Sequence, residues 1–149
     1  MDLSSNSMGN IMGKYLITED IGRVYFGHPG PTYKTKYESQ GIKEIEKKFP
    51  NYKVINPNQP GIESLYKKIG FDVFFNLIDK CVFGVFMTAL DGRWGIGIYE
   101  EAYYMHKSGK KVYELNPNTW EFKLVKDPTK TKYYALGLTK KGEVKRRKP

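Results

Sequence analysis

Two acidic residues, Asp91 and Glu101, enclose the glycine-rich stretch that is best suited to chemistry in this sequence. The stretch follows an apolar run over residues 82–89 and leads into a helical pattern over residues 97–107. A strand, a glycine-rich turn and an amphipathic helix in that order place acidic side chains at the carboxyl end of the strand, where open α/β sheets bind ligands. The order of these segments therefore predicts a ligand site with carboxylates at this edge of a sheet.

Two glycines in this stretch, Gly95 and Gly97, allow the backbone to approach a ligand closely, and we predict that they bind substrate. A dinucleotide-binding fingerprint would need a third glycine at position 100, but the sequence has Glu100 there. A carboxylate at that position would repel a pyrophosphate on the helix N-terminus, so we exclude a conventional Rossmann phosphate site. The alternative interpretation of Glu100 and Glu101 is that they only complement the helix dipole.

A first buried strand should end at Gly27 and bring further polar groups to the same edge. Tyr25 and Gly27 belong to this strand, and His28 begins the proline-rich turn after it. Together with Asp91 and Glu101 they form a set that suits cleavage of a glycosidic bond. One carboxylate can attack or stabilise a cationic sugar carbon while a second acid protonates the leaving group. A phenol that is hydrogen-bonded to the nucleophilic carboxylate would fix its orientation.

The elements that must position these residues alternate between strands and helices. Strands are predicted at residues 23–27, 52–55, 82–87 and 111–115, and helices at 33–49, 62–80 with a break at Gly70, and 97–107. In the helical region before the third strand, the side chains expected to face inward are Leu65, Ile69, Phe74, Leu77 and Ile78. This order predicts a single-domain α/β fold, a three-layer sandwich with a mainly parallel, doubly wound sheet of the Rossmann or flavodoxin type. Segments 121–125 and 133–138 should pair as an antiparallel C-terminal extension.

The composition of the chain fits one domain and sets limits on its partners. The 149 residues include 40% hydrophobic ones, and no run approaches the roughly 20 apolar residues of a membrane helix, so we expect a cytoplasmic protein without a membrane partner. The single cysteine, Cys81, excludes an internal disulfide and is better explained by packing than as a nucleophile. His28 and His106 lack zinc-ligand spacing. We expect no metal and no cofactor.

The net charge of +9 is concentrated near the end of the chain. We divide the chain into a flexible N-terminus (1–13), an α/β domain (14–139) and a basic tail (140–149). The tail carries Lys140, Lys141, Lys145, Arg146, Arg147 and Lys148. It either contacts nucleic acid or a nucleotide phosphate, or is simply a solvated tail.

The strand residues 24–27, with Asp91, Gly95 and Gly97 before Glu101, resemble the nucleoside 2-deoxyribosyltransferase superfamily over about residues 23–115. The resemblance implies that the tyrosine of the first strand orients a catalytic glutamate. In that family the glutamate attacks the anomeric carbon of the sugar, displaces the base and forms a covalent deoxyribosyl-enzyme. Tyr25 and Glu101 match these two positions.

Other positions match the family less directly. The family's residue spacing, counted back from Gly109, favours Glu101 as the nucleophile. Counted forward from the glycine turn, the spacing points nearer to Glu100. The family's aspartate that handles the leaving base or the sugar hydroxyls matches Asp91 if the chain has a short insertion after it. A sugar-binding aspartate before the third strand has three candidates, which are Asp72, Asn76 and Asp79. The resemblance also implies a homo-oligomer, with Asn116 as the residue that completes a neighbouring site.

The remaining candidates concern the base and the phosphate. Trp94 either stacks on a base or is buried over the sheet, and His28 either contacts a base or caps its loop. Lys34 and Lys36 lie where phosphate-accepting relatives bind a 5′-phosphate, although those relatives favour serine and glycine there. We therefore expect an enzyme that cleaves or transfers at the N-glycosidic bond of a nucleoside or nucleoside 5′-monophosphate. The alternative is a non-catalytic module that senses nucleotides or binds nucleic acid.

Overall fold

The computed structural model describes residues 22–59, 61–70, 72–131, 133, 136–138 and 144–146. The N-terminal segment 1–13 that we predicted to be flexible lies outside these residues. Most of the predicted basic tail does so too, except residues 144–146.

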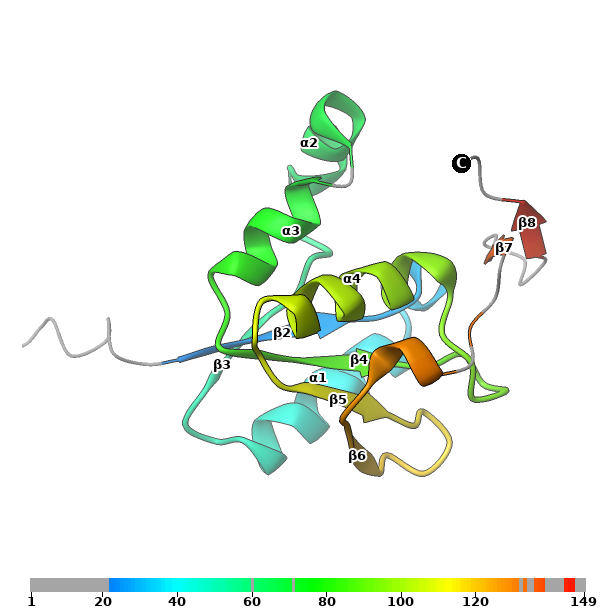
Figure 1. The fold of residues 1–149 in the computed structure, drawn as a ribbon. Coiled ribbons are helices and arrows are strands. Elements are labelled where there is room, and N and C mark those ends of the chain that lie inside the picture. Colours follow the sequence, from blue (N-terminus) through cyan, green and yellow to red (C-terminus); the bar gives the residue numbers. More distant parts are fainter. Residues whose placement is uncertain are drawn as a thin grey trace, which may run out of the picture.

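A five-stranded mixed sheet forms the centre of the α/β fold (Figure 1). Its strands are β2 (Arg23–Gly27), β3 (Lys53–Ile55), β4 (Phe83–Met87), β5 (Val112–Leu115) and β6 (Phe122–Val125), in the order β3-β2-β4-β5-β6. The first four strands in this order are parallel, and β6 pairs antiparallel with β5. The carboxyl ends of β2 and β4 are therefore at the same edge, where Gly27 pairs with Phe86.

The central strands are apolar because both of their faces are covered. Every residue of β4 is buried, and in β2 only Arg23 is exposed. Near-continuous apolar runs are typical of parallel strands that are buried on both faces. The predicted mainly parallel α/β sheet is confirmed in this respect.

Four α-helices and two short 3₁₀-helices connect and follow these strands. The helices are η2 (Gly30–Thr32), α1 (Lys36–Lys48), α2 (Ile62–Ile69), α3 (Asp72–Asp79), α4 (Ile96–Lys107) and η3 (Pro128–Lys130). Thr35 caps α1, since its side chain accepts a hydrogen bond from the backbone N–H of Tyr37. The predicted break near Gly70 is confirmed, because α2 ends just before it and α3 begins at Asp72.

Two apolar clusters hold helices against the sheet. In one of them, Ile45 of α1 packs with alternate residues of the strands, including Val24 and Val85. In the other, Ala102 of α4 packs with Tyr25 and further strand residues that point the opposite way. Because successive side chains of a strand alternate between faces, α1 and α4 contact different faces of the sheet.

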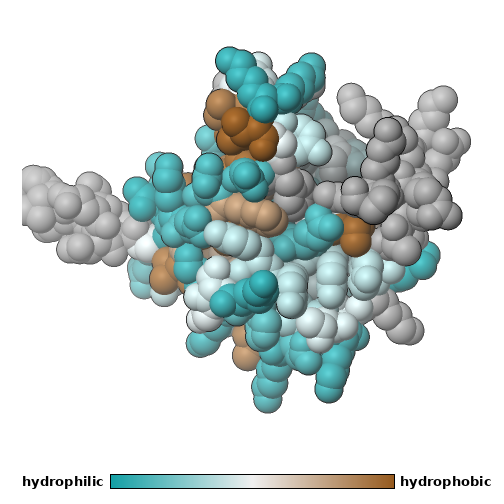
Figure 2. Space-filling model, turned by 45° about the horizontal axis from the view of Figure 1, so that its top comes forward, coloured by the Kyte–Doolittle hydropathy of each residue, from teal (hydrophilic) through white to brown (hydrophobic). Residues whose placement is uncertain are grey.

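The expected burial of two residues in α2 was wrong. Leu65 is 45% exposed and Ile69 is 49% exposed. Helix α2 projects from the body of the molecule and packs on α3 instead of the sheet, so its apolar face has no strand beneath it (Figure 1). Apolar side chains are visible at this end of the surface in Figure 2. The sequence pattern predicted the helix correctly but could not tell what would cover it.

The expected C-terminal extension is only partly confirmed. Strand β6 joins the edge of the sheet as predicted, with Phe122 paired to Leu115. However, β7 (Leu136–Leu138) pairs with β8 (Val144–Arg146) in a separate two-stranded sheet, and not with β6. The helix η3 follows β6 and begins at Pro128, which cannot continue a strand ladder. Strand β8 lies within the segment that we had assigned to the basic tail.

Candidate active site at the carboxyl edge of the sheet

Tyr25 and Glu101 form a buried hydrogen-bonded pair between β2 and α4. The Tyr25 hydroxyl donates to Glu101 Oε1 over 2.9 Å, although the two residues are 76 positions apart in the chain. Burial, and then the nearby charge of Glu101, raise the pKa of Tyr25 well above its usual value. The phenol therefore stays protonated at neutral pH and acts as a donor. The hydrogen bond expected from the sequence is present.

Gly27 packs closely beside this pair, so position 27 has no room for a side chain. A Cβ atom at position 27 would lie 2.5 Å from Phe86 Cδ1 and 3.1 Å from Glu101 Oε1. Gly27 follows Tyr25 by two residues in the same strand, so both residues face α4. A larger residue would have to displace either the Phe86 ring or the carboxylate of Glu101. The sequence analysis selected Gly27 for substrate binding, and the structure places it beside the candidate nucleophile.

Tyr33 is a further aromatic residue at this edge, and the sequence analysis missed it. Burial raises the pKa of Tyr33, and the charges of Glu101 and then Glu38 raise it further. Its ring centroid lies 4.7 Å from that of His28. The Tyr33 side chain therefore lies near both buried carboxylates of this region. No feature of the sequence singles it out, since it is one of 12 tyrosines.

Glu38 is the centre of a second buried polar cluster. Its Oε2 atom is 2.8 Å from His28 Nε2 and accepts a hydrogen bond of 3.0 Å from Asn58 Nδ2. Its Oε1 atom accepts a 3.0 Å hydrogen bond from the backbone N–H of Lys34. Glu38 thus connects α1 with the loop after β2 and the loop after β3. The sequence analysis missed Glu38, but the pattern Thr35-x-x-Glu38 at the start of a helix could have indicated it.

His28 is fixed inside the loop after β2. Its Nδ1 atom lies 3.0 Å from the carbonyl oxygen of Phe26, and its ring stacks on that of Phe26 at 4.2 Å. Burial lowers the pKa of His28, while the hydrogen bonds to Glu38 and to Phe26 act in the opposite direction. The pKa of Glu38 is lowered because the hydrogen bond from His28 and others outweigh its burial. Of the two roles weighed for His28, this geometry matches the loop cap.

The left-handed backbone of Lys34 belongs to the same loop. Lys34 has a φ of 61°, which is uncommon for a residue with a side chain. Its N–H bond to Glu38 holds this conformation. The side chain of Lys34 is exposed, and so is that of Lys36. Both lysine side chains therefore lie at the surface, Lys34 just before the N-cap of α1 and Lys36 in its first turn.

Trp94 is buried in the core and does not offer its ring to a base. The side chain is 1% exposed, and its Nε1 atom donates a 3.3 Å hydrogen bond to the carbonyl oxygen of Phe86. The rings of Trp94 and Phe86 are 6.2 Å apart in an edge contact. Burial against the sheet, which was the alternative interpretation of Trp94, is therefore what the structure supports.

Asp91 lies at the surface of the loop between β4 and α4. Its side chain is 43% exposed, and its Oδ2 atom accepts hydrogen bonds from the guanidinium of Arg93, one of them at 2.8 Å. Its Oδ1 atom accepts a bond from the backbone N–H of Arg93. These bonds close the turn, in which Gly92 has a φ of 88° that favours glycine.

The two glycines predicted to bind substrate flank the start of α4. Gly95 is the N-cap residue, with an ordinary φ of −68°, and a Cβ atom there would have no neighbour within 4 Å. Gly97 lies in the first turn of the helix. Neither an unusual conformation nor a close approach of the protein itself requires glycine at position 95.

Asn116 lies in the turn between β5 and β6. Its Oδ1 atom accepts a 2.7 Å hydrogen bond from the backbone N–H of Asn118. Asn118 Nδ2 in turn donates to the carbonyl oxygen of Leu90 over 2.9 Å. The turn that contains Asn116 is thereby fastened to the loop that carries Asp91.

The structure distinguishes between the alternatives left open for the acidic residues. Glu101 is the partner of Tyr25, whereas Glu100 is partly exposed. Asp79 accepts a 2.7 Å hydrogen bond from the Tyr104 hydroxyl at the end of α3, just before the amino end of β4. Asp79 therefore lies away from the carboxyl edge. Asp72 begins α3, and Asn76 is exposed in the middle of that helix.

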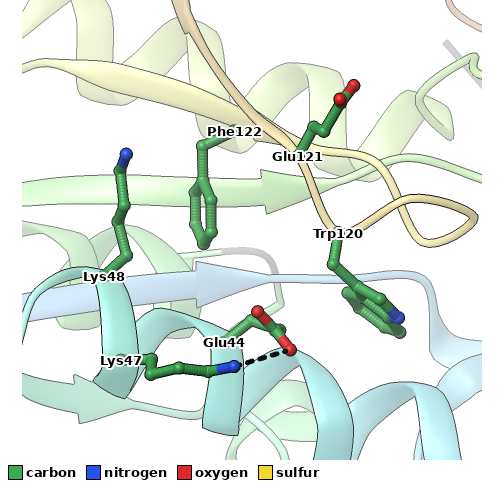
Figure 3. Close-up of a pocket in the computed structure, with 6 residues that line it drawn as sticks. All are labelled: Glu44, Lys47, Lys48, Trp120, Glu121 and Phe122. Carbon is green, nitrogen blue, oxygen red and sulfur yellow. Dashed lines mark ion pairs between the residues drawn. The ribbon is translucent and has the colours of Figure 1, made fainter.

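Two hollows on the surface lie away from the Tyr25–Glu101 pair. The larger one, of about 560 Å³, lies between α1 and the end of the β5–β6 turn (Figure 3). It is lined by Glu44, Lys47, Lys48, Trp120, Glu121 and Phe122. The smaller one, of about 320 Å³, lies at the end of α4. Tyr25 and Glu101 line neither of these two hollows.

Metal-binding clusters and membrane-spanning helices are absent from the part of the chain that the structure describes. Within it, no three His, Cys, Asp or Glu side chains are grouped in a way that could hold a metal ion. None of its helices combines the length and the apolar character needed to cross a bilayer. Cys81 is buried, and burial raises the pKa of its thiol to about 11.

No protein-family model matches the chain, and no curated protein or solved structure matches it either. Any functional assignment therefore depends on the geometry of the site itself.

Proposed function

We propose that the protein cleaves or transfers at the N-glycosidic bond of a nucleoside or nucleoside 5′-monophosphate, with Glu101 as the nucleophile. The observation that supports this most directly is the 2.9 Å hydrogen bond from the Tyr25 hydroxyl to Glu101 Oε1. A buried carboxylate fixed by a phenol is pre-oriented for attack, since the side chain has few other conformations. Gly27 lies directly beside this carboxylate.

The reaction would proceed in two displacements. A carboxylate oxygen of Glu101 attacks the anomeric carbon of the sugar, the bond from that carbon to the base nitrogen breaks, and its electron pair leaves with the base. Water or a second base then attacks the same carbon and releases Glu101. The leaving base takes up a proton from water, and Asp91 is our proposed catalytic residue for contacting the leaving base or the sugar hydroxyls. Its ion pair with Arg93 must open for that role, so the proposal requires motion of this loop.

The test is chromatography of deoxynucleosides and their 5′-monophosphates after incubation with the protein, with and without a second free base. We expect free base or an exchanged nucleoside from the natural chain and no product from Glu101→Gln. Glu100→Gln is the matched control, because Glu100 is the adjacent acid and should keep activity. Equal loss in both variants, or full activity in Glu101→Gln, would overturn the assignment of the nucleophile.

A second candidate is a module of the same architecture that binds nucleotides without catalysis. It is favoured by the position of the two hollows, neither of which is lined by Tyr25 or Glu101. The same chromatography separates the two, since a binding module gives no product from any substrate while equilibrium dialysis still detects nucleotide. The nucleic-acid role of the basic tail concerns residues that mostly lie outside the described part.

We further propose a doubly wound three-layer arrangement and a cytoplasmic homo-oligomer, as the resemblance to deoxyribosyltransferases implies. The two apolar clusters on different faces of the sheet support the first of these.

A further inference from the structure

Three stacked tyrosines lie at the outer face of α4, and we call them the tyrosine ladder. Tyr99 and Tyr103 belong to the helix, and Tyr133 stacks on Tyr99 from a later segment. Tyr99 and Tyr103 are four residues apart on the helix, so they lie on the same face. Their ring planes differ by only 2°, with centroids 6.3 Å apart. Tyr133, which follows η3, stacks on Tyr99 at 4.0 Å. Tyr103 and Tyr133 are each 38% exposed, so the ladder presents aromatic rings to solvent.

This ladder is on the opposite side of α4 from the candidate active site. Glu101, Ala102 and Met105 point into the protein and are buried. Figure 1 shows η3 beside α4, and the two elements are in contact. Tyr133 itself forms a backbone bridge with Trp94, just before α4 begins. A ligand on the ladder would not need to enter the site at Tyr25 and Glu101.

Basic residues continue the ladder toward the end of the helix. Lys107 follows Tyr103 by one turn, and its Nζ atom lies 5.3 Å from the centroid of the Tyr103 ring. Beyond it is the hollow of about 320 Å³, which we call the basic hollow. It is lined by His106, Gly109, Lys110, Lys111, Val112, Leu124, Val125 and Lys126, and none of these residues is acidic.

Two of the lysines are available for an external anion. Lys110 Nζ donates to the carbonyl oxygens of Ile78 and Asp79, so this lysine is already hydrogen-bonded to the C-terminal end of α3. Among the residues that the structure describes, Lys111 and Lys126 have no ion pair with an acidic side chain. Both are exposed.

Asp127, an acidic residue next to this surface, is engaged within its own turn. Its Oδ1 atom accepts hydrogen bonds from the backbone N–H and the hydroxyl of Thr129. These bonds lower the pKa of Asp127, and the charges of Lys130 and His106 contribute in the same direction. Within the basic hollow, the charged side chains of the lining are those of lysines.

We propose that the tyrosine ladder and the basic hollow together bind single-stranded nucleic acid. Unpaired bases stack on exposed aromatic side chains, while lysines follow the phosphates, and this combination is typical of proteins that bind single strands. The bases would stack on Tyr103 and Tyr133, and the phosphates would contact Lys107, Lys111 and Lys126. The net charge of +9 adds a long-range attraction for a polyanion. This function goes beyond glycosidic chemistry and does not depend on it.

The experiment measures fluorescence anisotropy of a labelled oligothymidylate about 12 nucleotides long, within the site sizes of single-strand binders. The full-length chain is compared with Tyr103→Ala, which removes an exposed ring, and with Tyr103→Phe, which keeps it. We expect Tyr103→Ala to weaken binding roughly tenfold and Tyr103→Phe to bind like the natural chain. A duplex of the same length and heparin serve as polyanions without unpaired bases, and both should bind more weakly.

A charge-matched pair of variants tests the basic hollow. Lys111→Ala/Lys126→Ala should weaken binding and reduce the slope of log K against log salt by about 1.4, since each phosphate contact contributes about 0.7. Lys47→Ala/Lys48→Ala removes the same charge from the exposed side of α1 and should change the affinity little. The natural basic tail is present in all variants, so its contribution cancels from the comparison.

Three results would overturn the proposal. Equal losses in the two lysine pairs would show that diffuse charge or the tail binds the strand, and equal binding of duplex or heparin would exclude base stacking. An unchanged affinity in Tyr103→Ala, together with a smaller particle mass in light scattering, would show that the ladder contacts a second copy of the chain instead. Glu101→Gln should bind the oligonucleotide normally, which keeps this test separate from that of the proposed enzyme.

Discussion

Glu101 and Glu38 are both buried acidic residues near the carboxyl end of β2, but the protein uses them in different ways. Both oxygens of Glu38 accept hydrogen bonds from the protein, and the three donors belong to two loops, the one after β2 and the one after β3. Glu101 accepts a hydrogen bond from a phenol that burial keeps protonated, and it lies next to the closely packed Gly27. The first arrangement fastens loops together, whereas the second joins β2 to α4 and holds the carboxylate that we propose as the nucleophile. Burial of an acid alone thus does not identify a reactive group.

The largest effect that should separate the Tyr25–Glu101 pair from the Glu38 cluster is on the proposed catalytic activity. Tyr25→Phe keeps the packed ring but removes the donor to Glu101, so we expect turnover to fall by roughly 10²-fold through loss of orientation. The measurement is the rate of base release from the substrate that proves active. A rate within threefold of the natural one would mean that the phenol does not orient the carboxylate.

The second expected effect is on stability. His28→Ala leaves the Glu38 carboxylate buried without its main partner, which should lower the free energy of unfolding by about 3–5 kcal/mol. Urea denaturation followed by circular dichroism measures this loss. In His28→Ala/Glu38→Gln the loss should be smaller than the sum of the single losses, because the pair is coupled. Additive losses would contradict the role of Glu38 as the centre of this cluster.

A third, smaller effect concerns the space beside Glu101. Gly27→Ala would place a Cβ atom within 2.5 Å of the Phe86 ring, so a shift of that ring should cost about 1–3 kcal/mol of stability. Turnover should fall as well, because the same Cβ atom crowds Glu101 Oε1. Gly95→Ala is the control, since a Cβ atom there meets no neighbour. Comparable effects of the two substitutions on stability would argue against a crowded position 27.

The smallest expected effect is the dependence of stability on pH. His28 has a pKa below its ordinary value of 6.5 when folded, so its contribution is full above pH 6.5 and declines as the pH falls below it. The lowered pKa of Glu38 makes a contribution that is present above pH 4.5 and is lost on further acidification. Both groups thus destabilise the fold in acid. The urea midpoint should fall as the pH is lowered from 6.5 to 4.5, and it should fall less in His28→Gln than in the natural chain. A midpoint independent of pH would contradict this.

Much of the framework could be predicted from sequence because it depends on local patterns. The limits of β2, the helix that carries Glu101 and the break near Gly70 follow from apolar periodicity and glycine positions. The Tyr25–Glu101 hydrogen bond could be anticipated once both residues were assigned to one edge.

The parts that were missed depend on contacts between distant segments. Tyr33 has no local signature that distinguishes it from solvent-exposed residues of a loop, and the capping pattern Thr35-x-x-Glu38 does not tell that Glu38 is buried among other segments. Trp94 is buried where its indole N–H can donate to the distant Phe86 carbonyl oxygen. Leu65 is exposed because no strand lies below α2. Periodicity finds an apolar face but does not tell which element will cover it, and the pairing of β7 with β8 shows the same limitation.

The two tryptophans of the chain also provide separate optical reporters for the two faces of the sheet. Trp94 is enclosed in the cluster with Tyr25 and α4, so its emission should be blue-shifted and shielded from acrylamide. Trp120 is partly exposed at the larger hollow, on the side of α1, and should be quenched readily (Figure 3). Without any added label, fluorescence can therefore tell whether the candidate active site and the opposite face loosen together or one after the other.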